Sequence, residues 1–179
     1  PGFAQAFSGA TDNSVQALAT ALFAAFAAVS SLLAGGTVNE ALVLKTEGAQ
    51  LQAQASDQWA YYQAKGIKAI VLEAQRGMLA SADKPLSPDI DKNIARYKDE
   101  QQEAKKKAEE FEHERDEKGK EADHLIYRHH YFSYAVAMLQ VAIALGAVAA
   151  LTRKRLAWLG STALGLVGAA IFLWAFFGH

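Results

Sequence analysis

The chain contains no cysteine, which excludes disulfide bonds and thiolate chemistry and leaves the cellular compartment open. Proline is scarce as well, and two of the three prolines, Pro85 and Pro88, stand within one short stretch. Because proline interrupts helices, this distribution is typical of an all-helical protein with one sharp interior turn. The net charge of -1 gives no electrostatic footprint for nucleic acid.

Charged residues are missing from two long parts of the sequence. Residues 15–34 carry none, and residues 131–178 carry only the three basic residues at 153–155. Residues 37–130 hold nearly all the others. So uneven a distribution predicts a membrane part and a water-exposed part rather than one globule.

Three apolar runs are long enough to cross a hydrocarbon core, which needs about 20 helical residues. They cover residues 15–36, 131–151 and 156–178. No Lys or Arg precedes Lys45, whereas a secretory signal peptide begins with a positively charged region. We therefore interpret the first run as a retained membrane anchor rather than a cleaved signal.

Aromatic and histidine side chains mark the expected ends of the spans, because such rings favour the membrane–water boundary. The predicted interfacial belt consists of Tyr127, His129, His130, Tyr131 and Trp174. Gln140 lies near the middle of the second span, where an amide is expected to hydrogen-bond a neighbouring helix. A role in lining a pore is left open for it.

The short loop between the second and third spans predicts the orientation in the membrane. It carries Arg153, Lys154 and Arg155, and basic residues in short loops stay on the cytoplasmic side. Residues 37–130 then lie on the opposite side, in the periplasm of a bacterium.

Residues 37–130 are predicted to form an antiparallel helical hairpin that turns near 83–88. The second arm, after Pro88, has a heptad seam between charged faces. Its positions are Ile90, Ile94, Tyr97, Gln101, Ala104, Ala108, Phe111, Arg115, Lys118, Ala122 and Leu125. For the first arm we choose an uncharged stripe as its partner. That stripe consists of Leu42, Thr46, Ala49, Ala53, Ser56, Ala60, Ala64, Ile67, Val71, Ala74 and Met78.

Three large rings, Trp59, Tyr61 and Tyr62, stand in the otherwise polar first arm. This pairing brings Trp59 close to Phe111, but a seam made mostly of alanine buries too little area for all three rings. We interpret the surplus as a contact between neighbouring hairpins, with an unspecific exposed patch as the alternative. The residues predicted to form the packing or oligomer interface are Trp59, Tyr61, Tyr62, Ile67, Val71 and Phe111.

Catalytic and metal-binding patterns are weak. The spacing Glu-x-x-His occurs at Glu110 and His113 and at Glu121 and His124, as in di-iron bundles, but no acidic partners stand on an apolar face of the first arm. Glycine-rich phosphate loops, nucleophile elbows and HExxH are absent from the sequence. We therefore expect no enzyme activity, no catalytic residue, no metal and no cofactor.

Several segments resemble a known bacterial family. They are NEALVLK (39–45), ASDQWAYYQAKGIK (55–68), RHHYFSYAVAMLQVAIALGAVAALTRK (128–154) and the glycine-rich last span. The family is domain of unknown function 4337. The resemblance implies a three-span bacterial inner-membrane protein with a large helical insert after the first span, and it implies no activity.

The predicted fold is an all-α membrane protein with three transmembrane helices and a long antiparallel coiled-coil stalk outside the membrane. Its segments are 1–36, 37–130 and 131–179. We expect a non-enzymatic homo-oligomer, in contact with membrane lipid, that acts as a scaffold or assembly element. The alternatives are an oligomeric channel or transport component and an accessory subunit of a larger membrane complex.

Overall fold

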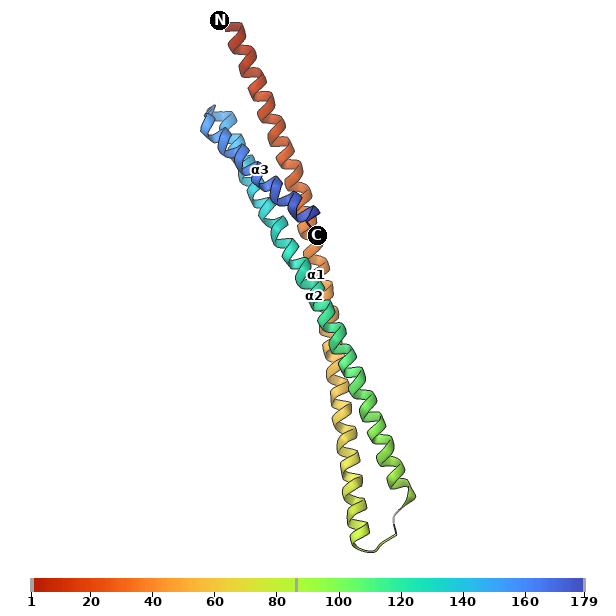
Figure 1. The fold of residues 1–179 in the computed structure, drawn as a ribbon. Helices are drawn as coiled ribbons and strands as arrows, with labels where there is room; N and C mark the ends of the chain where they lie inside the picture. The colour runs from red at the N-terminus through yellow and green to blue at the C-terminus, as the bar shows by residue number, and fades with distance from the viewer. Residues whose placement is uncertain (1, 86, 179) are drawn as a thin grey trace. The chain divides into compact units, whose positions relative to one another are not determined.

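The computed structural model describes residues 2–85 and 87–178, with side chains from residue 14 onward. These residues form three α-helices and no β-strand, which confirms the predicted all-helical class. The helices are α1 (Gly2–Ser81), α2 (Pro88–Thr152) and α3 (Arg155–Phe177) (Figure 1). By length and composition alone, all three could cross a membrane. The side chains of residues 1–13, in the predicted segment 1–36, lie outside the described residues.

Local sequence explains how the chain leaves α1 and enters α2. Asp83 has a φ of 54°, the left-handed conformation that commonly ends a helix, and the Lys84 amide donates back to the Leu79 carbonyl at 3.1 Å. Ser87 caps α2, because its side-chain oxygen accepts from the Asp89 amide at 3.4 Å. Pro88 occupies the first helical position, where its missing N–H costs nothing.

The chain divides into two compact units, each described by itself. The first, which we call the apolar unit, contains residues 1–42 and 122–179, and the second, the hairpin unit, contains residues 43–121. The sequence predicts boundaries after residues 36 and 130 instead. The apolar unit thus includes both ends of the segment predicted as the hairpin.

The apolar unit packs α3 against parts of α1 and α2 through two clusters of buried side chains. One contains Ala34, Phe132, Ala135, Phe172 and Ala175. The other contains Phe23, Ala27, Leu139 and Ala142. Small residues bring the helices close: a Cβ on Gly165 would overlap the Phe23 ring, and one on Gly168 would come within 3.2 Å of the Leu139 backbone nitrogen. Such close approach is typical of helices that associate in lipid.

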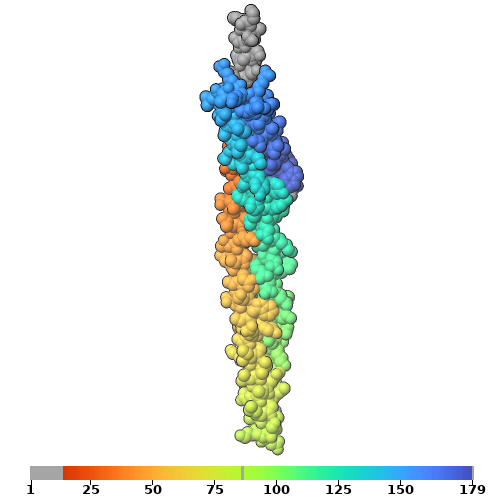
Figure 2. Space-filling model, turned by 90° about the vertical axis from the view of Figure 1, so that its left-hand side faces the viewer, coloured from red at the N-terminus to blue at the C-terminus, as the bar shows by residue number. Residues whose placement is uncertain are grey.

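The hairpin unit consists of two antiparallel arms, and its α2 arm packs as predicted. Every predicted seam position from Ile90 to Lys118 is buried or half-buried, while the residues between them are mostly exposed. Figure 2 shows the surfaces of the two arms meeting side by side. The heptad pattern therefore identified the inward face of this arm correctly.

The predicted register of the α1 arm is wrong. The predicted stripe faces away from α2: Ile67, Val71 and Met78 are 62%, 58% and 73% exposed. The face that meets α2 consists of Leu44, Gly48, Leu51, Ala55, Gln58, Tyr62, Lys65, Ala69 and Leu72, all buried or half-buried. Both faces have heptad spacing and few charges, so periodicity alone could not choose between them.

Candidate functional site

Polar contacts between the arms explain which face of α1 turns inward. Four ion pairs and one hydrogen bond link side chains at the edges of that face to α2. They are Glu47–Lys118 (2.8 Å), Glu73–Lys98 (2.6 Å), Arg76–Asp91 (2.9 Å), Lys65–Glu100 and Arg115–Gln52. Turning α1 by half a revolution would separate all of these partners, so they fix the register together with the buried seam.

The three aromatic residues of the α1 arm make contacts within their own hairpin. The Trp59 indole N–H donates to Glu112 Oε1 at 2.8 Å, and the Trp59 ring meets Tyr62 edge to face at 5.5 Å. The Tyr61 hydroxyl donates to Glu100 at 3.4 Å. Phe111, the predicted partner of Trp59, is half-buried on the α2 seam beside Glu112. The rings therefore need no neighbouring hairpin to explain their presence.

The ion pairs shift the pKa values of their members. The Lys98 ammonium, hydrogen-bonded to Glu73, lowers the pKa of that carboxyl, and Lys65 lowers the pKa of Glu100 in the same way. Glu100 in turn raises the pKa of Lys65, and Glu47 raises the pKa of Lys118. Folding thus favours the charged forms on both sides.

These shifts predict that acid weakens the hairpin. A carboxyl whose pKa is lower in the folded state stabilises that state above its unfolded pKa of about 4, and the contribution is lost as the pH falls through the folded value. The raised lysine pKa values add stability that disappears only in strong alkali. We expect the midpoint temperature of thermal unfolding, measured by circular dichroism, to be lower at pH 3 than at pH 7.

The matched variant for this experiment carries Glu73→Gln and Glu100→Gln, which removes both shifted carboxyls and no others. Its midpoint should fall less over the same pH range. If the midpoint temperature of the wild type and that of the double variant fell by the same amount, these pairs would not be the cause of the acid sensitivity.

An uncharged stripe runs along the side of the α1 arm that faces away from α2. At about 100° per residue its members share one face, roughly opposite the buried Ala69. We call it the outward stripe, and it consists of Ala49, Ala53, Ser56, Ala60, Ala64, Ile67, Val71, Ala74 and Met78, all exposed. The Ser56 hydroxyl donates to the Gln52 carbonyl of the same helix at 2.9 Å, so it adds no unmet polar group.

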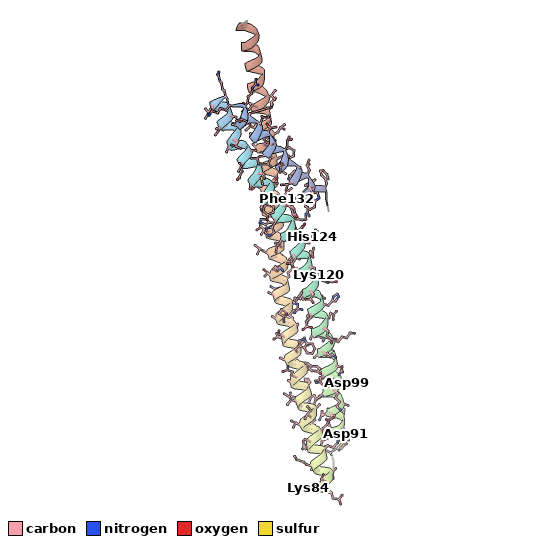
Figure 3. The ribbon with its side chains drawn as sticks, turned by 60° about the vertical axis from the view of Figure 1, so that its left-hand side comes forward. Lys84, Asp91, Asp99, Lys120, His124 and Phe132 are labelled. Atoms are coloured by element: carbon pink, nitrogen blue, oxygen red, sulfur yellow. The ribbon has the colours of Figure 1, made fainter. Side chains whose placement is uncertain are left out.

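The corresponding outer face of the α2 arm has the opposite character. It consists of Ala95, Asp99, Gln102, Lys106, Glu109, His113, Glu117 and Lys120, all exposed and mostly ionisable (Figure 3 labels Asp99 and Lys120). This face is suited to water. The hairpin thus presents one apolar side and one charged side, and only the apolar side resembles a surface that another helix covers.

A polar groove of about 470 Å³ lies between the arms. Its lining residues are Asp57, Gln58, Tyr61, Glu100, Glu103, Ala104 and Lys107. Glu100 pairs with Lys65, and Glu103 pairs with Lys107 at 2.8 Å. Because these charges already neutralise one another, the groove is a poorer candidate for a binding site than the outward stripe.

The predicted belt residues cluster in the apolar unit. The hydroxyl groups of Tyr127 and Tyr131 lie 2.8 Å apart, and the rings of Tyr131 and Trp174 are 4.6 Å apart. His129 Nδ1 lies 2.9 Å from the Ala34 carbonyl oxygen. A carbonyl only accepts hydrogen bonds, so Nδ1 carries the proton and donates. The His130 ring lies beside Tyr134, with centroids 6.5 Å apart.

The four remaining predicted residues, which are the three basic loop residues and Gln140, are exposed. Arg153, with a φ of 54°, and Lys154 form the tight connection between α2 and α3, and Arg155 is the first residue of α3. Gln140 points away from the core of the apolar unit rather than into it. No residue among 14–85 and 87–178 hydrogen-bonds its side chain, so the predicted bond to a neighbouring helix stays a prediction.

Within residues 14–85 and 87–178, no group of three or more His, Asp or Glu side chains is placed to hold a metal ion. Two separate features remain as candidates for contact with other molecules: the outward stripe of the hairpin unit and the exposed Gln140 of the apolar unit. The sequence predicted contacts for both sets of residues, but it placed the outward stripe against α2.

Comparison with known proteins assigns the chain to a family. The family model described as Domain of unknown function (DUF4337) matches residues 12–178. The chain belongs to this family. The DUF4337 match covers both compact units, and the resemblance seen in the sequence is confirmed. No curated protein and no solved structure matches the chain.

Proposed function

We propose that this DUF4337 protein is a homo-oligomeric integral membrane protein without enzyme activity, and that its hairpin unit is an assembly element. Three helices apolar enough to span a bilayer support the membrane assignment. The observation that carries the assembly role is the outward stripe, because it exposes Ile67, Val71 and Met78 on a face of the arm that has no charge.

Burial of the outward stripe would remove a substantial apolar area from water. Ile67, Val71 and Met78 are each more than half exposed, and full burial of such a side chain is worth about 1.5–3 kcal/mol. Towards the other end the stripe contains only alanine and serine, which let a second helix approach closely. The surface is therefore suited to a long helix–helix contact.

The occupant we propose is a second copy of the same arm. In two copies with the same orientation the arms run parallel, so the small residues of the two stripes meet each other and the larger Ile67, Val71 and Met78 meet their counterparts. Within residues 49–78 the charged side chains that flank the stripe are Asp57 and Lys68, which are few and of opposite sign. Two such faces can meet without a concentration of like charge.

We propose the bacterial inner membrane as the location, with the hairpin unit in the periplasm. The basic residues Arg153, Lys154 and Arg155 would hold the loop between α2 and α3 in the cytoplasm. In this arrangement the assembled hairpins form a scaffold outside the membrane, and lipid surrounds the apolar unit.

Single-cysteine variants test assembly and orientation together, because the chain has no cysteine of its own. Val71→Cys places a thiol on the outward stripe, and Gln102→Cys places one on the charged face of α2. We expect Val71→Cys to give a disulfide-linked dimer on mild oxidation in membranes, because the thiols of two copies meet there. Gln102→Cys should give at least tenfold less of the disulfide-linked dimer.

The Gln102→Cys variant also reports orientation. Its thiol should react with a membrane-impermeant reagent in intact spheroplasts, and labelling only after lysis would place the hairpin in the cytoplasm. Equal crosslinking of the two variants would contradict the stripe as an interface. A monomeric mass with no crosslink at Val71 would favour an accessory subunit whose stripe is covered by a foreign chain.

A further inference from the structure

Gln140 is exposed on the apolar unit, near the middle of the apolar run 131–151. Among residues 14–85 and 87–178, no side chain or backbone group forms a hydrogen bond with the side-chain amide of Gln140. Gln16, in the same unit, differs: its amide nitrogen donates to the Gly146 carbonyl at 3.4 Å. Of these two glutamines, Gln16 is thus satisfied internally and Gln140 faces outward.

The exposed residues within two turns of Gln140 on its own face of α2 are small, and Val141 and Val148 flank this face. Ala137, Ala144 and Ala147 share its outward face and are exposed. This face lies on the opposite side of the helix from the buried Ala135, Ala142 and Ala149. The exposed face of α3 is bulkier, because Leu159 and Leu166 alternate there with Ala163 and Ala170. A bulky face is suited to lipid, and a small face is suited to another helix.

The amide is the decisive group. The middle of a bilayer offers no water, so a glutamine there needs a partner from protein. An amide side chain has both a donor and an acceptor, so it can pair with an identical amide across a symmetry axis. Alanine on either side lets two backbones come close enough for such a pair to form.

We infer that the face formed by Ala137, Gln140, Ala144 and Ala147 contacts the same face of a second copy within the membrane, with the Gln140 amides hydrogen-bonded to each other. This inference rests on the proposed membrane insertion and homo-oligomerisation, and it adds a surface separate from the outward stripe. It also gives the exposed amide a partner without invoking a water-filled pore.

The test places a reporter one helical turn from the amide and leaves the amide in place. Ala144→Cys should give a disulfide-linked dimer on oxidation in native membranes, whereas Leu166→Cys, on the bulky face of α3, should give little. Adding Gln140→Leu to Ala144→Cys should weaken the association about three- to thirtyfold, the range expected for one interhelical hydrogen bond. Adding Gln140→Asn, which keeps an amide, should retain most of the crosslink.

Three results would overturn the inference. The first is no crosslink from Ala144→Cys in membranes where Val71→Cys does crosslink, which would leave the proposed assembly through the hairpin intact. The second is an unchanged yield after Gln140→Leu. The third is rapid reaction of Gln140→Cys with a small hydrophilic thiol reagent, which would place this residue against water. A crosslink from Ala144→Cys without one from Val71→Cys would support the membrane contact and contradict the outward stripe.

Discussion

Replacement of Val71 by glutamate is expected to weaken self-association about a hundredfold, equivalent to roughly 2.7 kcal/mol. Val71 lies within the branched part of the outward stripe and is 58% exposed in the single chain. In the assembly its replacement would bring a carboxylate from each copy into an uncharged contact, where like charges facing each other cost several kcal/mol. The molar mass of the detergent-solubilised protein, measured by light scattering, reports the change.

Ala95→Glu is the matched control for this variant. It adds the same charge to an exposed helical position, but on the outer face of α2, which already carries Asp99. The mass of this variant should equal that of the wild type, and both variants should retain their helical circular dichroism. If Val71→Glu kept the wild-type mass over a hundredfold dilution, the outward stripe would not be the assembly surface.

Replacement of Phe132 by alanine is expected to lower the free energy of unfolding by about 3 kcal/mol. The ring is fully buried, its centroid lies 6.1 Å from that of Phe172, and the Arg128 guanidinium lies 5.8 Å above it. Transfer of apolar groups contributes little when the surroundings are lipid, so most of the loss comes from the cavity and the lost packing contacts. Reversible unfolding by a denaturing detergent measures the difference.

Phe177→Ala makes the same chemical change at a position where it should have little effect on the free energy of unfolding. Phe177 is 74% exposed at the end of α3, and substitutions at such positions usually change stability by less than about 0.5 kcal/mol. Equal losses for the two variants would contradict the packing of the apolar unit around Phe132.

The two arms of the hairpin differ in how far their sequences determine their packing. On α2, charges cover every face except one, so Ile94, Ala104 and Ala108 could only turn inward, and they do. On α1 the charges are sparse, and two faces with heptad spacing and few charges lie on opposite sides. The larger aliphatic residues, Ile67 and Val71, made the wrong face look like the seam.

Trp59 illustrates the same limit for a single residue. Its position near the α2 residues around 111 was predictable from the antiparallel arrangement. Its actual partner, the Glu112 carboxylate, depends on the rotation of α1, which brings the indole N–H to the edge of the seam. The predicted surplus of rings disappears once this rotation is known, and the argument for assembly moves from the rings to the outward stripe.

The sequence by itself determined that the chain is helical, where its three apolar stretches lie and which face of the α2 arm is buried. These features depend on local composition and on the 3.6-residue period, both of which the sequence contains in full. Only the tertiary structure decided which face of α1 meets α2 and that Gln140 faces outward. The rotation of a helix about its own axis depends on the ion pairs and ring contacts that it makes with a distant part of the chain, and periodicity within one helix carries no information about those partners.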